Sequence, residues 1–273
     1  MKYYRPESLD IYFKLRQQLA GKDVVVLAGG TDLMPRYERG QALPDHLIDL
    51  KQLSQLSSIK VSDDFVEIGA LTSIQDLHDH AVIIEEFSAL HQAAHEFAGA
   101  QIRHRGTIGG NICNASPAGD LLPSLYAFGA TLELTSEMGQ RILPIAEFIL
   151  GPGKTTLRAD ELLTSIQMPR TNYESKFIKV GLRQSMAISV VNIALIYNRL
   201  KISFTDLKIA VGAVGPTIIT LDNFTSAYLA NPAQLASHLH LIKEAISPID
   251  DIRATATYRQ TVLNNLIQDF LKR

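Results

Sequence analysis

The first fifty residues carry one helical and two strand-like patterns of hydrophobic positions. Apolar residues recur at near-helical spacing from Glu7 to Ala20, with Pro6 in a favourable first-turn position and Gly21 as a stop. A short, fully apolar run at 24–27 is typical of a buried strand, and 47–50 has the character of a second strand. The pattern therefore predicts a helix followed by two strands.

The pattern between residues 59 and 169 indicates a second unit. Phe65 to Ala70 alternates like a strand, and Thr72 to Gln75 has the form of a capping box that opens a helix. The remaining predicted elements of this unit are helices at 87–98 and 120–128 and strands at 131–135 and 162–168.

A third unit starts near Asn172. Its predicted elements are strands at 177–182, 190–197 and 207–214, followed by helices at 232–246 and 255–271. Strands that precede a group of helices indicate an α+β lobe.

The composition is that of an ordinary globular protein. Of the 273 residues, 46% are hydrophobic and 20% are charged, so the chain can bury a substantial core. The net charge of −2 gives no reason to expect nucleic acid as a partner. No apolar run approaches the roughly 20 residues of a membrane-spanning helix. Because the N-terminus also lacks a secretory signal, we expect a cytoplasmic protein.

The chain has a single cysteine, Cys113. An iron–sulfur cluster normally needs several thiolates, so this chain is not expected to hold one by itself. We predict no metal site here, and any iron–sulfur partner would be another chain.

The first of two glycine-rich segments runs from Val26 to Leu33 and contains Gly29 and Gly30. Paired glycines after a strand let successive backbone N–H groups converge, and this is one way in which proteins bind phosphate oxygens. Thr31 adds a hydroxyl. The alternative is a plain turn in which Asp32 caps the next element.

The second segment, 105–120, contains four glycines and two asparagines between apolar stretches. So many small and polar residues predict a long loop close to a polar ligand. Asp120 either caps the following helix or accepts hydrogen bonds from a ribose or flavin. Neither segment has the Gly-Lys-Ser/Thr of a Walker A loop or the Gly-x-Gly-x-x-Gly of a Rossmann fold. Together they indicate a dinucleotide-like ligand.

Three motifs occur in order, LAGGTDL at 27–33, TIGGNI at 107–112 and ASPAGDLLP at 115–123. Together they resemble the FAD-binding medium subunit of the xanthine dehydrogenase and carbon monoxide dehydrogenase family, the molybdenum hydroxylases. The resemblance covers nearly the whole chain, with weaker motifs in the last third.

The resemblance implies an α+β fold in two lobes. Residues 1–171 would form a PCMH-type FAD-binding lobe, with subdomains at about 1–56 and 57–171 and FAD between them. Residues 172–273 would form a flavoprotein C-terminal lobe with a three-stranded sheet and a helical bundle.

The same resemblance implies FAD as cofactor and a set of residues that bind it. The first segment would wrap the pyrophosphate through backbone N–H groups, and the second would bind it from the other side. The implied residues are Val26, Leu27, Ala28, Gly29, Gly30, Thr31, Asp32, Leu33, Phe97, Thr107, Ile108, Gly109, Gly110, Asn111, Asp120, Leu163 and Lys179.

Several of these side chains have a structural alternative. Phe97 and Leu163 lie in apolar elements, where core packing explains them equally well, and Lys179 could be a solvated residue of a strand. The basic stretch Arg103–Arg105 is either solvated charge or support for a phosphate or a docking partner.

The resemblance further implies a hetero-oligomer. A molybdopterin subunit would oxidise the substrate and an iron–sulfur subunit would relay electrons to the FAD of this chain, which would pass them to an acceptor such as NAD. Residues 183–188 contain no acidic residue, unlike many NAD-reducing members, so the acceptor stays open. The alternatives are a self-sufficient FAD oxidase or dehydrogenase, in which Cys113 could attach the flavin covalently, and a flavin-free scaffold.

Overall fold

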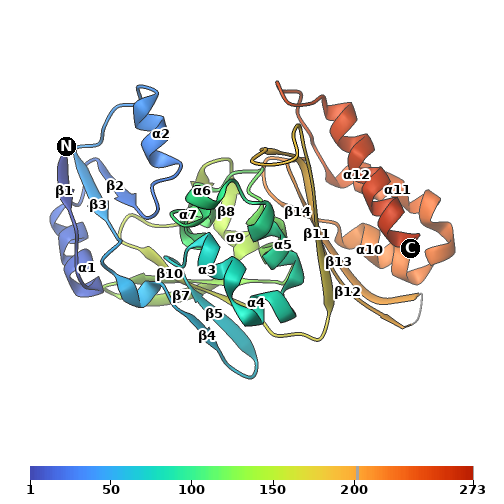
Figure 1. Cartoon of the computed structure of the whole chain (residues 1–273), viewed down its shortest axis with the longest axis horizontal. Helices are drawn as coiled ribbons and strands as arrows, with labels where there is room; N and C mark the ends of the chain where they lie inside the picture. Colours follow the sequence, from blue (N-terminus) through green and yellow to red (C-terminus); the bar gives the residue numbers. More distant parts are fainter. Residues whose placement is uncertain (201–202, 273) are drawn as a thin grey trace.

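The structure is a computed structural model in which residues 1–200 and 203–272 are described. Three bodies follow one another along the longest axis (Figure 1): a small N-terminal sheet, a group of short helices on a second sheet, and a long twisted sheet that carries the last helices. The described helices include none that is long and apolar enough to cross a membrane.

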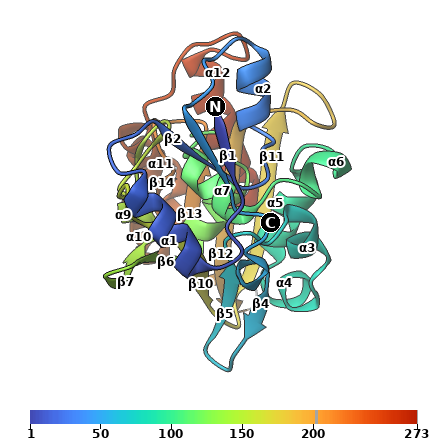
Figure 2. The ribbon, with the colours of Figure 1, turned by 90° about the vertical axis from the view of Figure 1, so that its left-hand side faces the viewer.

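The N-terminal body is a parallel sheet with strand order β1-β3-β2. Its elements are β1 (Lys2–Tyr4), α1 (Leu9–Gln18), β2 (Val24–Leu27), α2 (Leu33–Glu38) and β3 (His46–Asp49). The predicted first helix begins only at Leu9, because the Ser8 side chain caps it. Strand β2 lies at an edge, so Val24–Val26 are half-buried rather than buried as predicted. Figure 2 shows β1 and α1 in front of the second body.

The second body is built on an antiparallel sheet with strand order β4-β5-β10-β6-β7. These strands are β4 (Ile59–Val61), β5 (Phe65–Gly69), β6 (Thr131–Ser136), β7 (Gly139–Pro144) and β10 (Leu162–Pro169). The helices are α3 (Ile74–Asp79), α4 (Ala81–Glu86), α5 (Ser88–Glu96), α6 (Ala100–Arg103), α7 (Ile108–Asn114), α8 (Leu121–Ala127) and α9 (Ile145–Phe148). A short hairpin follows, β8 (Ile149–Gly151) with β9 (Lys154–Thr155).

The C-terminal body contains one strand and one helix more than we predicted. Its sheet has the order β11 (Glu174–Gly181), β12 (Ser189–Leu200), β13 (Ser203–Gly212) and β14 (Ile219–Thr220). The expected sheet of three long strands is therefore extended by a two-residue edge strand. The helices are α10 (Asp222–Ala230), α11 (Leu235–Ala245) and α12 (Ala256–Leu271), and α10 was not predicted.

One continuous core joins the second and third bodies. Helices α5 and α8 pack against strands β11, β12 and β13, and every residue of α8 is buried. Phe177 of β11 and Ala194 of β12 belong to the same buried cluster as the inner faces of β5, β6 and β10. The C-terminal sheet is therefore held rigidly against the helix that follows the second glycine segment.

Candidate functional site

The two glycine-rich segments meet where the N-terminal sheet faces the second body. A Cβ atom on Gly29 would lie 1.9 Å from the carbonyl oxygen of Arg105, and one on Gly110 would lie 3.8 Å from the Cβ of Ala28. A Cβ on Gly106 would lie 3.4 Å from the hydroxyl of Thr31. Only glycine permits so close an approach at Gly29. We call this contact between residues 28–31 and 105–110 the glycine junction.

The first segment offers unused backbone donors. Gly30 has a positive φ of 80°, which turns the chain sharply between β2 and α2. Within 1–200 and 203–272, the N–H groups of Gly29, Gly30 and Thr31 donate to no protein atom. These half-buried donors, side by side at the end of a strand, suit the oxygens of a pyrophosphate. The residues present therefore fit the phosphate part of FAD.

The second segment is not the long loop that we predicted, because residues 108–114 form helix α7. The hydroxyl of Thr107 caps it by accepting from the N–H of Gly110 at 3.1 Å. The N–H of Gly109 donates to the carbonyl of Ala70 at 2.9 Å, and that of Ile108 donates to Thr72 at 3.1 Å. The second segment thus has close backbone packing where we expected free donors.

Two polar side chains next to the glycine junction, Asn111 and Asp32, differ in their surroundings. The Oδ1 atom of Asn111 is buried and has no hydrogen-bond partner among the described residues, so it can accept a hydrogen bond from a ligand. Asp32 does not cap α2 with its side chain but forms an exposed ion pair with Arg36. Arg36 also donates to Oδ1 of Asn114 at 2.7 Å, so it links α2 to α7.

The apolar side chains of the predicted site are mostly buried or half-buried. Leu27 and Ile108 are buried, and Leu33 begins α2. Leu163 on β10 is 3% exposed within the main core, which favours core packing over flavin contact for its side chain. Phe97 follows the last residue of α5 and is only partly buried.

Asp120 and Lys179 form a buried ion pair. Lys179 Nζ lies 2.6 Å from Asp120 Oδ2, and the two side chains are 5% and 9% exposed. Lys179 also donates to the carbonyl of Glu96 at 3.0 Å. The lysine is therefore not the solvated residue that was one alternative. With two of its three N–H donors used, it keeps one for a ligand.

Sequence reasoning missed two residues that hold Asp120. Its Oδ1 accepts from Ser189 Oγ at 2.6 Å and from Asn192 Nδ2 at 3.2 Å. Asn192 is the cross-strand neighbour of Lys179 in the β11–β12 ladder, so the sheet brings both donors to one carboxylate. Asp120 precedes α8 without capping it through its side chain. Its side chain instead accepts hydrogen bonds from this network, which only the strand register could have revealed.

Two open cavities adjoin at Glu96 and Lys179. One, of about 440 Å³, is lined by Glu96 and residues 179–187. The other, of about 360 Å³, is lined by His91, Gln92, His95, Glu96, Phe177 and Lys179. Both cavities are open beside Lys179.

Within the basic stretch Arg103–Arg105, the side chain of Arg103 has structural contacts, whereas His104 and Arg105 are exposed. Arg103 Nε donates to Gln75 Oε1 at 3.1 Å, and its Nη1 donates to the carbonyls of His95 and Phe97. Arg103 therefore fixes the end of α5 beside α3.

Cys113 is expected to resist alkylation in the folded protein. Burial raises the pKa of its thiol to about 12, so almost no thiolate exists near neutral pH. Iodoacetamide at about pH 8 should leave Cys113 unmodified until the chain is unfolded, as followed by mass spectrometry of the intact protein. By the same reasoning the flavin should be released by acid precipitation. A flavin that stayed on a Cys113 peptide would contradict this and support covalent attachment.

Comparisons with known proteins agree with this geometry. The profile of the FAD binding domain in molybdopterin dehydrogenase matches residues 1–171. That of the CO dehydrogenase flavoprotein C-terminal domain matches residues 176–273.

Two relatives and one solved structure are similar to the chain. The glyceraldehyde dehydrogenase medium chain of Sulfolobus acidocaldarius is 30% identical over 274 residues, which cover 99% of this chain and 96% of that one. The nicotinate dehydrogenase FAD-subunit of Eubacterium barkeri is 34% identical over 195 residues, which cover 70% of this chain and 66% of that one. In the solved structure of carbon monoxide dehydrogenase from Hydrogenophaga pseudoflava, one chain superposes with a TM-score of 0.92 at 26% identity. The match covers 98% of this chain and 95% of that one.

These matches confirm the resemblance inferred from the glycine motifs, the two-lobe fold and FAD as the cofactor. The chain belongs to the family of FAD-binding medium subunits of molybdenum-hydroxylase-type oxidoreductases.

Proposed function

We propose that this chain passes electrons from an iron–sulfur subunit, through FAD held at the glycine junction, to an acceptor such as NAD. The observation that carries the proposal is the set of unused N–H groups at Gly29, Gly30 and Thr31, packed against the second glycine segment. When bound, FAD supplies the electron-transfer chemistry, and the protein supplies binding and orientation.

The residues of the predicted site bind different parts of the cofactor. The first segment binds the pyrophosphate through its free N–H groups, and α7 closes the other side by close backbone contact. The free N–H of Lys179 and the partly buried ring of Phe97 lie at the end of α5 and are assigned to the flavin end. Asp120 acts through Lys179, because its own oxygens already accept three hydrogen bonds.

The cysteine content supports the proposal that an iron–sulfur partner is a separate subunit. With one cysteine, which is partly buried, the chain lacks the thiolates of an iron–sulfur cluster. The described residues also contain no group of three or more His, Cys, Asp and Glu side chains that could hold a metal. In the proposed route, electrons from an iron–sulfur cluster would therefore reach the flavin from another chain. The relatives named medium chain or FAD-subunit support a hetero-oligomer with iron–sulfur and molybdopterin subunits.

The proposal is tested by affinity purification of the native protein from its own cells, followed by metal analysis and FAD release. We expect iron, molybdenum and FAD in one complex, and substrate-dependent NAD reduction by the complex but not by the isolated chain. A metal-free homo-oligomer that oxidises a small molecule by itself would instead identify a self-sufficient flavoenzyme.

A further inference from the structure

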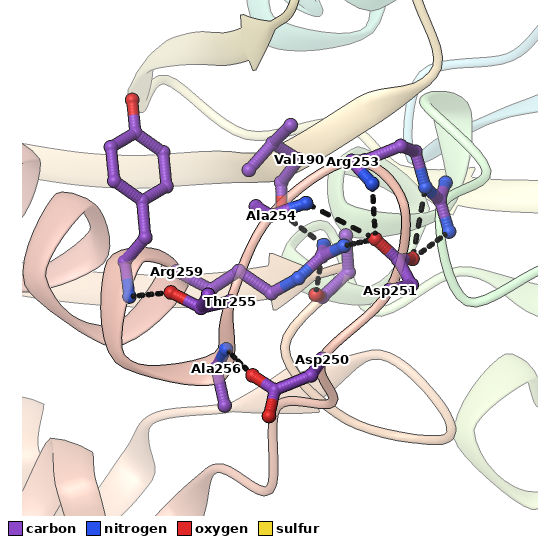
Figure 3. A network of polar contacts seen from close by, with 10 residues as sticks. Val190, Asp250, Asp251, Arg253, Ala254, Thr255, Ala256 and Arg259 are labelled. Atoms are coloured by element: carbon purple, nitrogen blue, oxygen red, sulfur yellow. Dashed lines mark hydrogen bonds and ion pairs between the residues drawn. The ribbon is translucent and has the colours of Figure 1, made fainter.

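A buried arginine joins the last helix to the strand ends beside Asp120. Arg259, in the first turn of α12, is 1% exposed (Figure 3). Its Nη1 donates to the carbonyl oxygens of Val190 at 2.6 Å and Ala213 at 3.0 Å. Its Nη2 donates to Oδ1 of Asp251 at 2.8 Å. One guanidinium therefore holds the start of β12, the end of β13 and the loop before α12 together.

Asp251 is itself held in place by its own loop. Its Oδ1 accepts from the N–H groups of Arg253 at 2.8 Å and Ala254 at 3.2 Å, and its Oδ2 accepts from the Arg253 side chain at 2.6 and 3.0 Å. Burial alone would raise the pKa of Asp251, but these hydrogen bonds and the charge of Arg253 hold it well below the ordinary value. The Asp251 carboxylate that anchors Arg259 is therefore negatively charged and held in place.

The two carbonyls that Arg259 binds belong to the backbone that supports Asp120. Val190 follows Ser189, whose hydroxyl donates to Asp120 at 2.6 Å. The N–H of Ala213 donates to the carbonyl of Pro117, on the loop that leads into Asp120, at 2.8 Å. Ala213 has a φ of 63°, a conformation that a residue with a side chain rarely adopts without support. The hydrogen bond from Arg259 to its carbonyl provides that support.

We propose that Arg259, anchored by Asp251, is a positioning residue for the flavin site. It fixes the ends of β12 and β13, so that Ser189 and Asn192 hold Asp120, and Asp120 holds Lys179. The inference rests on the proposed placement of Lys179 at the flavin. Through this chain of contacts the C-terminal lobe controls how the cofactor is held in the N-terminal lobe.

The alternative is that Arg259 only stabilises its own lobe. Arg253 provides a matched control, because it pairs with the same carboxylate but, within the described part of the chain, donates no hydrogen bond to Val190 or Ala213. In an Arg253→Met variant, Asp251 keeps its backbone donors and its bond to Arg259. Both arginines contribute to stability, but only Arg259 is expected to affect the flavin.

The test measures two properties of Arg259→Lys and Arg259→Met, the dissociation constant of FAD for the apo-protein and the midpoint potential of the bound flavin. A lysine keeps the charge but lacks the planar fork that spans two carbonyls and a carboxylate. We expect FAD to bind about tenfold more weakly in Arg259→Lys, with a shifted potential, because the buried network is lost in part. Arg253→Met should bind FAD within about twofold of the wild type.

The outcomes separate this inference from the proposed function. If Arg259→Met does not fold, Arg259→Lys decides. If Arg259→Lys keeps the wild-type FAD affinity and flavin potential while Lys179→Met changes them, the positioning role of Arg259 is wrong. The proposed function would still stand. Wild-type behaviour of Lys179→Met would instead remove Lys179 from the flavin site. The double variant of Arg259→Lys and Lys179→Met is also informative. If it binds FAD no more weakly than Lys179→Met alone, the proposal is supported, because both residues then act through one contact.

Discussion

A Gly29→Ala variant is expected to lose FAD affinity by about a hundredfold or more, because it separates the two glycine segments. The added Cβ would lie 1.9 Å from the carbonyl oxygen of Arg105 and 2.8 Å from its carbonyl carbon. Both atoms belong to the backbone, so no side-chain rotation relieves the clash. The first segment has to move, and its free N–H groups no longer converge. Such overpacking also destabilises a fold by about 1–3 kcal/mol.

The measurement is FAD titration of the apo-protein, with far-UV circular dichroism and thermal unfolding in parallel. Gly151→Ala is the matched control, because its Cβ meets no atom within 4 Å and its φ is not positive. It should bind FAD like the wild type. Normal flavin affinity in Gly29→Ala, at unchanged circular dichroism, would contradict the placement of the pyrophosphate at the glycine junction.

Elements with local start signals could be predicted from the sequence. The last helix was predicted at 255–271 and spans Ala256–Leu271, because Thr255 supplies the capping hydroxyl and the apolar spacing is helical. The capping box near 72–75 does open a helix, but one residue later than predicted. Ser73 caps α3 by accepting from the N–H of Asp76 at 3.0 Å.

The helix α7 could not be predicted, because its local propensity opposes it. Gly109 and Gly110 in a first turn disfavour helix and favour a loop. Contact with the rest of the fold determines instead that these residues form a helix. A Cβ on Gly109 would lie 2.6 Å from the carbonyl oxygen of Ala70, so the glycine lets the helix pack directly on the chain after β5. The same glycine sequence that indicated a phosphate loop is thus needed for packing.

Side-chain roles were the least predictable part of the site. Sequence left Lys179 open between a solvated residue and a cofactor contact, and its burial depends on the pairing of β11 with β12. Sequence also left Leu163 open between core packing and a flavin contact, and its side chain lies in the core. Periodicity indicates which face of a strand is apolar, but it does not indicate which distant residues cover that face.

Lys179→Met is expected to lower the stability of the fold by about 3–5 kcal/mol and to abolish tight FAD binding. Removing the lysine leaves the carboxylate of Asp120 buried with only two neutral donors, Ser189 and Asn192. An uncompensated buried charge is much less favourable than the pair it came from. The matched control is Lys60→Met, which breaks an ion pair with Glu67 in which the lysine is 69% exposed. For Lys60→Met we expect a loss of stability of less than about 1 kcal/mol.

Adding Asp120→Asn to Lys179→Met separates stability from cofactor binding. The amide removes the orphaned charge and keeps an acceptor for Ser189 and Asn192, so chemical denaturation should show that much of the lost stability returns. FAD affinity should stay low, because the N–H that Lys179 offers to the cofactor is still missing. If affinity returned together with stability, Lys179 would act only by neutralising Asp120. The assignment of its third N–H to the flavin end would then be wrong.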